Sequence, residues 1–259
     1  MGKQFMTKPL IITMGDPTGV GPEIIIRAAA AGAWSQLPSP VVIAGDLEVL
    51  LRAARVCGLD AWPQTGSTQA LASTEIVLGR HRLALQPVSA QDVESLVYGR
   101  PDAVSGRAMA DYINWACDCC LGGVAAGMVT APINKQALQA AGEPYPGHTE
   151  LLAARCGVDK VVMMLAGERL RVCLVTTHCA LHEVPQRLTK EEILTTLRIT
   201  AADLEARFGI NKPRLAVLAL NPHAGEAGLF GDEEVRLIAP AVAAAQAEGL
   251  DASGPYSAD

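Results

Sequence analysis

The feature that most constrains the fold is an alternation of short apolar runs with longer amphipathic runs. The short runs are typical of buried strands, and the longer ones place apolar residues at helical spacing. This alternation favours an α/β fold with a largely parallel sheet. In the first half we expect strands at Leu10–Thr13, Val41–Ala44 and Ala125–Thr130, helices at Pro22–Ala31, Leu47–Val56, Val104–Leu121 and Ile133–Ala140, and a loop-rich stretch at residues 60–75.

The second half differs in style. Val161–Ala166 and Leu170–Thr176 flank a short polar turn, which predicts a β-hairpin. Thr189 followed by Glu192 predicts a capping box at the start of a helix that Gly209 ends. The linker-like stretch at residues 142–148 precedes this hairpin, so we place a domain boundary near residues 130–148 and divide the chain into domains at 1–140 and 141–259.

Three further features follow in this second domain. The predicted helix buries a stripe that includes Phe208, and a buried strand follows at Leu215–Leu220. A last helix opens at Asp232, and Pro240 inside it should produce a kink. Residues 254–259 show no clear strand returning to the sheet, so we expect this domain to be incomplete at its C-terminal end.

Composition and charge exclude several classes of protein. The 259 residues are 50% hydrophobic and carry a net charge of −6. Neither half is basic, which argues against a nucleic-acid or anionic-membrane surface. No apolar stretch reaches the ~18 residues of a membrane span, and the N-terminus has no signal-peptide core. We expect a cytoplasmic protein.

The cysteines raise the question of a metal or redox cluster. There are seven, an odd number, and Cys117, Cys119 and Cys120 lie close together in sequence. Their stretch has helical spacing that Gly122 terminates. We expect reduced thiols acting as buried or half-buried small apolar residues, with a redox or metal role as the alternative.

Three histidines follow predicted strands or enter loops. His178 ends the second strand of the hairpin, His223 follows Leu215–Leu220, and His148 lies in a Pro-Gly loop. Ligands of open α/β sheets gather at the carboxyl ends of strands, and imidazoles suit divalent transition metals. The spacing alone leaves a metal role and a capping or surface role open. His182, four residues after His178, could form a second pair with it, but a loop is the simpler interpretation.

Two Gly- and Pro-containing segments also follow strands. Residues 15–23, Gly-Asp-Pro-Thr-Gly-Val-Gly-Pro-Glu, match neither common phosphate-binding pattern. Their amides could hold an anion at a helix start, or the segment could be a tight turn. Lys135 ends the segment Thr130-Ala-Pro-Ile-Asn-Lys. It could contact a phosphate or transfer a proton, or it could simply be solvated.

Together these segments resemble the PdxA family of 4-hydroxythreonine-4-phosphate dehydrogenases. The resemblance rests on five motifs in order, and it runs from about residue 8 to residue 259. The motifs begin at Met14, Thr130, Tyr145, Thr176 and Asn221, and read MGDPTGVGPE, TAPINK, YPGHTE, TTH and NPHAGE.

The resemblance implies a fold, an activity and a set of site residues. The fold would be two α/β/α domains like those of isocitrate and isopropylmalate dehydrogenases, in a homodimer with a shared active site. The activity would be NAD-dependent (or NADP-dependent), divalent-metal-dependent oxidation and decarboxylation of 4-phosphooxy-L-threonine in pyridoxal 5′-phosphate biosynthesis. His178 and His223 match metal ligands for Zn, Mg or Co, and His148 with Thr149 matches the substrate-binding pair. Lys135 is the candidate catalytic residue.

The resemblance also implies that parts of the family's site lie beyond residue 259. These are a third metal histidine, further substrate-binding residues and much of the NAD site. We therefore expect little dehydrogenase activity from residues 1–259 alone. The alternatives are a dehydrogenase of 4-phosphothreonate, 4-phosphoerythronate or an aromatic-acid cis-dihydrodiol, and an inactive truncated homologue. A metal hydrolase using His178 and His223 is a further, weaker alternative.

Overall fold

The computed structural model describes residues 7–258, and the chain divides into two compact units, Met1–Asp159 and Lys160–Asp259. The division falls after Asp159, whereas the sequence analysis placed it after residue 140. The reason is that helices α4 and α5 pack against α3 of the first unit. The elements of the first unit are β1 (Leu10–Thr13), α1 (Gly21–Ala30), β2 (Val41–Gly45), α2 (Leu47–Val56), β3 (Trp62–Thr65), β4 (Thr74–Leu78), β5 (His81–Pro87), α3 (Ala103–Leu121), β6 (Gly127–Thr130), α4 (Lys135–Ala140) and α5 (His148–Cys156).

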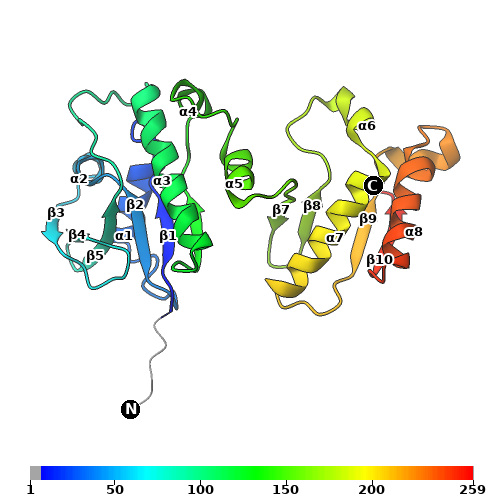
Figure 1. The fold of residues 1–259 in the computed structure, drawn as a ribbon, viewed down its shortest axis with the longest axis horizontal. Helices are drawn as coiled ribbons and strands as arrows, with labels where there is room; N and C mark the ends of the chain where they lie inside the picture. The colour runs from blue at the N-terminus through cyan, green and yellow to red at the C-terminus, as the bar shows by residue number, and fades with distance from the viewer. Residues whose placement is uncertain (1–6, 259) are drawn as a thin grey trace, which may run out of the picture. The chain divides into compact units, whose positions relative to one another are not determined.

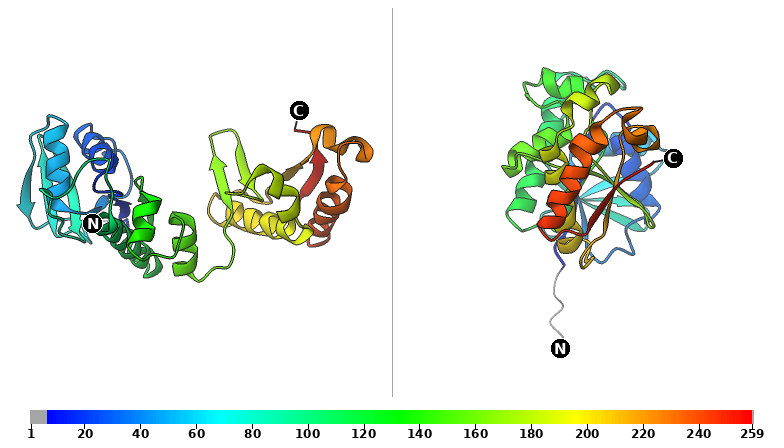
Figure 2. Two further views of the ribbon diagram at one scale, coloured as in Figure 1. Left: turned by 90° about the horizontal axis from the view of Figure 1, so that it is seen from above. Right: turned by 90° about the vertical axis from the view of Figure 1, so that its right-hand side faces the viewer.

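The first unit is built on a six-stranded sheet of order β3-β4-β5-β2-β1-β6. Strands β5, β2, β1 and β6 are parallel, while β3 and β4 join as antiparallel edge strands. Helices α1 and α2 follow strands β1 and β2 and lead the chain toward the β3 edge of the sheet. Helix α3 leads it back from β5 to β6 at the opposite edge. Right-handed crossovers therefore put α3 on the face opposite α1 and α2, and Figure 1 and Figure 2 show these layers. The main core lies between them and includes Ile11, Ile43 and Leu50, each 0% exposed.

Local chemistry explains the helices of this unit. Asp46 caps α2 by accepting from Val49 N at 3.1 Å, a bond type that typically contributes ~1 kcal/mol. Asp102 and Ser105 form a reciprocal capping box on α3. Helices α3 and α4 touch at Gly106, where an added Cβ would lie 2.0 Å from the Ala137 carbonyl oxygen. A side chain at this position would push the two helices apart.

The second unit contains smaller sheets. Its elements are β7 (Met163–Ala166), β8 (Arg171–Leu174), the 3₁₀ turn η1 (Leu181–Glu183), α6 (Val184–Arg187), α7 (Lys190–Ala206), β9 (Leu215–Leu218), the turn η2 (Pro222–Gly228), the π-helical turn η3 (Glu234–Ile238), α8 (Ala239–Ala247) and β10 (Ala252–Tyr256). Strands β7 and β8 form the predicted antiparallel hairpin. Strand β10 pairs in parallel with β9. Helices α7 and α8 pack on each other beside these strands (Figure 1).

Several predictions of elements are confirmed. Helix α2 has the predicted bounds, and α7 begins after Thr189, which accepts from Glu192 N at 3.1 Å and so forms one half of the predicted capping box. Pro240 lies in the first turn of α8, directly after the π-helical turn, and the predicted kink stays a prediction. Cys117 is buried and Cys119 and Cys120 are half-buried, as expected of cysteines used as apolar residues. Among the described residues no helix is long and apolar enough to cross a membrane.

Other predictions were wrong. The loop-rich stretch at 60–75 also contains the short strand β3, and helix α5, directly after the linker-like stretch, was not predicted. A strand does return after the last helix, because β10 pairs with β9 although its sequence, Ala-Ser-Gly-Pro-Tyr, is poor in strand-forming residues. Phe208 and Leu218 are 44% and 55% exposed rather than buried.

Candidate functional site

Two of the motif segments meet at the carboxyl ends of β1 and β6. The strands are in register, with Thr13 opposite Thr130. Beyond them, Asp16 N donates to the Pro132 carbonyl oxygen at 2.9 Å. Gly15 permits this contact, since it has φ 76° and an added Cβ would lie 2.4 Å from the same oxygen. The first and second motifs therefore form one continuous surface at this edge of the sheet.

The first motif owes much of its shape to an internal turn. Asp16 Oδ1 accepts from both the backbone N and the hydroxyl of Thr18, each at 2.8 Å. Both residues are buried, at 8% and 3% exposure. These bonds hold the loop in a tight turn, one of the two interpretations of this segment.

The third motif lies beside the second. Helix α4 starts after Asn134, which caps it by accepting from Ala137 N at 2.9 Å, so Lys135 is the first helical residue. Helix α5 starts after Gly147, where an added Cβ would lie 3.4 Å from Lys135 Cε and 4.0 Å from its Nζ. The exposed lysine therefore lies against the first turn of α5, which contains His148 and the exposed Thr149.

The histidine of this motif has an unusual environment. His148 Nε2 is buried and makes no hydrogen bond within the described part of the chain. Burial lowers the pKa of His148, and the nearby charge of Lys135 lowers it further. The imidazole is consequently neutral at pH 7, with an unsatisfied nitrogen beside an ammonium group. A buried polar atom of this kind costs free energy unless a ligand or water supplies a partner.

The other two motifs belong to the second unit. His178 follows β8 in an exposed position with φ 52°. His223 lies in the turn after β9, is also exposed, and has its ring 6.2 Å from that of Phe230. Strand β8 pairs with β7 and strand β9 pairs with β10, so the strands that precede the two histidines belong to different sheets.

The turn that carries His223 is held by a buried carboxylate. Glu234 is 3% exposed, and its Oε1 accepts from Leu220 N at 2.9 Å and from Asn221 N at 2.7 Å. Asn221 Nδ2 donates to Glu234 Oε2 at 3.0 Å and to Glu233 at 2.7 Å. Although burial opposes ionisation, these hydrogen bonds hold the pKa of Glu234 below its ordinary value.

The backbone of this turn is strained. Residues 223–227 all have positive φ, between 42° and 78°, and only Gly225 among them is a glycine. Left-handed backbone costs roughly 1–2 kcal/mol per non-glycine residue. Such strain persists only where surrounding contacts fix it, and it is concentrated at functional sites. Here the contacts are those of Asn221 and Glu234.

The two candidate metal ligands do not complete a site by themselves. Within residues 7–258 no group of three His, Cys, Asp or Glu side chains converges as a metal site requires. The assignment of His178 and His223 as ligands therefore stays a prediction. Their imidazoles have the donor chemistry for it, but two donors fall short of the usual three.

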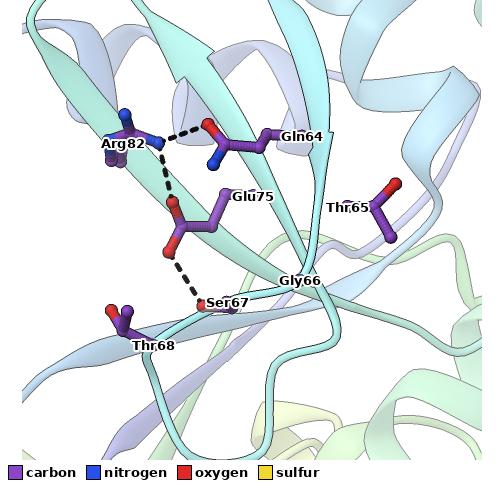
Figure 3. A pocket seen from close by; sticks show the side chains of 7 residues that line it. All are labelled: Gln64, Thr65, Gly66, Ser67, Thr68, Glu75 and Arg82. Atoms are coloured by element: carbon purple, nitrogen blue, oxygen red, sulfur yellow. Dashed lines mark hydrogen bonds and ion pairs between the residues drawn. The ribbon is translucent and has the colours of Figure 1, made fainter.

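A polar hollow lies elsewhere on the first unit, and its lining is drawn in Figure 3. It is formed around the β3–β4 connection by Gln64, Thr65, Gly66, Ser67, Thr68, Glu75 and Arg82. Glu75 accepts from Ser67 at 3.0 Å and from Arg82 at 3.1 Å, and Arg82 also donates to Gln64 at 2.7 Å. These side chains satisfy one another and fasten the loop to the edge strands, and no residue of the five motifs lines the hollow.

Sequence reasoning missed the role of Glu234. Its acidic stretch was interpreted only as a favourable start for the last helix. The signal was present as a carboxylate close after a turn rich in glycine, where loop amides need acceptors. The contact of Lys135 with the start of α5 was missed as well, because α5 itself was not predicted.

Comparisons with known proteins identify the family to which the chain is similar. The profile of the family described as "Pyridoxal phosphate biosynthetic protein PdxA" matches residues 36–259. The 4-hydroxythreonine-4-phosphate dehydrogenase of Geobacter metallireducens is 52% identical over 254 residues, which cover 98% of this chain and 73% of the relative. That of Trichlorobacter lovleyi is 48% identical over 253 residues, covering 97% and 74%.

Solved structures give the same result. The crystal structure of 4-hydroxythreonine-4-phosphate dehydrogenase from Klebsiella pneumoniae matches with a TM-score of 0.83 and 38% identity, covering 98% of this chain and 75% of that one. A terephthalate 1,2-cis-dihydrodiol dehydrogenase from Burkholderia xenovorans LB400 matches with a TM-score of 0.61 and 28% identity, covering 98% and 74%. The chain therefore belongs to the PdxA family of pyridoxal phosphate biosynthetic proteins.

Proposed function

We propose that this chain binds 4-hydroxythreonine-4-phosphate and contributes to its NAD-linked oxidation. The observation that carries the proposal is the buried, unpartnered Nε2 of His148 beside Lys135, on the motif that matches the family's substrate-binding pair. The relatives named above as 4-hydroxythreonine-4-phosphate dehydrogenases support the choice of substrate.

The proposed roles follow from charge and exposure. The Lys135 ammonium attracts the anionic groups of the substrate, and the exposed Thr149 hydroxyl can donate to them. The neutral His148 supplies a hydrogen bond through Nε2 that it does not make within the described residues. Lys135 is also the candidate for proton transfer, since its charge is close enough to lower the pKa of this histidine.

We assign His178 and His223 to a divalent metal ion, as the family resemblance implies. When bound, such an ion lowers the pKa of a coordinated alcohol and orients it. In this chain Asn221 and Glu234 hold the turn that carries His223, and they fix where its imidazole is presented. NAD would accept the hydride. A homodimer with a shared active site is proposed on the same resemblance.

Substrate binding is the measurement that tests this function without requiring turnover. Isothermal titration calorimetry of residues 1–259 should show binding of 4-hydroxythreonine-4-phosphate and much weaker binding of threonine. His148→Ala should weaken binding of the phosphorylated compound at least tenfold, while Gln139→Ala, an exposed residue of α4, should leave it unchanged. Equal affinity of wild-type and His148→Ala protein would contradict the proposed role.

The likeness to the terephthalate cis-dihydrodiol dehydrogenase supports one alternative, a non-phosphorylated aromatic-acid cis-dihydrodiol as substrate. Lys135 could bind a carboxylate as readily as a phosphate, so it does not decide between the two. A competition experiment distinguishes the two candidate substrates. If the substrate is the phosphorylated compound, inorganic phosphate should displace it. Tight binding of the dihydrodiol with no binding of 4-hydroxythreonine-4-phosphate would favour the alternative.

A further inference from the structure

Two thiols that the proposed function does not use lie together between α3 and α5. Cys117 Sγ is 3.9 Å from Cys156 Sγ. Cys117, on α3, is 3% exposed, whereas Cys156, the last residue of α5, is exposed. Both are free thiols. The sulfurs are close to contact, and less than about 2 Å of further approach brings them to the ~2.05 Å of a disulfide bond.

The neighbours of the two cysteines fix this contact. Arg155 Nε donates to Asp118 Oδ1 at 2.8 Å, and its Nη2 donates to Oδ2 at 2.5 Å, so the pair is bidentate. Each member of the ion pair adjoins one of the cysteines in sequence. One turn earlier on α5, Leu151 is 2% exposed and packs in the cluster formed with α3 and α4. The thiols therefore meet through docked helices rather than through mobile side chains.

The two thiols differ in accessibility, and this sets an order of reaction. Cys156 is open to a small oxidant in solution. Burial raises the pKa of Cys117 to about 11, and its hydrogen bond with Cys156 adds to the effect. Cys117 is thus protected from direct attack but is placed to react with a modified Cys156. An exposed cysteine beside a resolving cysteine is the arrangement found in thiol redox sites.

We propose that Cys117 and Cys156 form a site that hydroperoxides oxidise. The product is a reversible disulfide that links α3 to α5. In the first step the Cys156 sulfur attacks one oxygen of the peroxide, so that an S–O bond forms and the O–O bond breaks. With hydrogen peroxide the products are a sulfenic acid on Cys156 and one water. In the second step the Cys117 sulfur attacks that sulfur, the S–O bond breaks, and the hydroxyl leaves as water with the thiol proton. Two thiols lose two electrons in total, and one peroxide is reduced to two waters.

The disulfide would act on the helix that carries the proposed substrate-binding residues. Helix α5 runs from His148 to Cys156, and Leu151 is its one buried residue. A bond at Cys156 ties the end of this lightly packed helix to α3. This consequence rests on the proposed function, whereas the disulfide itself does not.

The test uses native residues 1–259 treated with one equivalent of hydrogen peroxide, then alkylated under denaturing conditions and mapped by mass spectrometry. We expect a peptide pair linked through Cys117 and Cys156, a mass loss of two hydrogen atoms, and full reversal by dithiothreitol. Cys156→Ala should abolish the linked pair. Cys173→Ala, a half-buried cysteine of the second unit, should leave it unchanged and is the matched control.

Foldedness is checked separately, by comparing the thermal midpoints of both variants with wild type under reducing conditions. Oxidation that links Cys117 to Cys120, links two chains, or stops at over-oxidised Cys156 would overturn the proposal. Loss of 4-hydroxythreonine-4-phosphate binding in the reduced chain would contradict the proposed function alone. The mapped disulfide would stand in that case.

Discussion

The two units of this chain differ in how completely they bury their apolar side chains. The first unit closes a six-stranded sheet between helical layers, and its main core includes Ile43 and Leu50 with no exposure. The second unit has two two-stranded sheets and leaves large side chains such as Leu165, Leu218 and Phe230 between 49% and 60% exposed. Buried apolar area is the main stabilising contribution to folding. The first unit should therefore be the more stable of the two.

Truncating a leucine in each unit should give the largest contrast. Leu50→Ala removes a fully buried side chain and should lower the free energy of unfolding by about 2–5 kcal/mol. Leu218→Ala, at 55% exposure, should cost less than about 1 kcal/mol. Urea unfolding separates the units optically, because the three tryptophans, at positions 34, 62 and 115, all lie in the first. A Leu218→Ala loss as large as that of Leu50→Ala would break the comparison.

Glu234→Gln should have an intermediate effect confined to the second unit. It removes the charge from hydrogen bonds that each contribute about 1.5–3 kcal/mol when one partner is ionised. The circular-dichroism transition should move to lower urea while the tryptophan transition stays. Glu233→Gln is the matched control, since Glu233 accepts only from the Asn221 side chain among the bonds described and should cost less.

The same residue predicts a dependence on pH. The folded-state pKa of Glu234 lies below its ordinary value of 4.5, so its stabilising contribution is present above pH 4.5. That contribution is lost as the pH falls through the folded-state pKa. Wild type and Glu234→Gln should thus converge in stability at acid pH. A constant difference between them from pH 7 to pH 3 would contradict this origin.

The smallest effect concerns His148 in the first unit. Its folded-state pKa lies below the ordinary 6.5, so the neutral form is favoured, and acid costs stability as the pH falls from 6.5 through the folded-state pKa. Proton NMR should give a titration midpoint below 6.5 for this imidazole. Lys135→Met should move the midpoint upward by removing a positive charge, and Lys135→Arg should not. An unchanged midpoint in Lys135→Met would show that the charge of Lys135 does not affect the pKa of His148.

Periodic patterns in the sequence were enough to predict most of the first unit. The helix with bounds Leu47–Val56 follows from apolar spacing and the capping Asp46, both of which act locally. Strand β10 could not be predicted in this way. Its residues Gly254 and Pro255 disfavour a strand, and pairing with β9 overrides that preference.

In the candidate site, too, features set by local sequence were predicted and features set by tertiary contacts were not. The motif residues were recognised individually, and the contact between the Asp16 and Pro132 segments agrees with two loops at adjacent parallel strand ends. The buried role of Glu234 was not foreseen, since it depends on a turn geometry that no local pattern encodes. The pairing of Cys117 with Cys156, 39 residues apart in the chain, depends on how α5 docks on α3 and was not predictable from local sequence either.

The close approach of helices α3 and α4 at Gly106 has a consequence for the proposed substrate site. Gly106 lies outside the five motifs, and the absence of a side chain there sets how closely α4 packs on α3. Lys135 is the first residue of that helix, so its position is inherited from a glycine 29 places earlier in the chain. A side chain at position 106 should therefore displace Lys135 and weaken the substrate binding proposed for it, although residue 106 lies outside the proposed site.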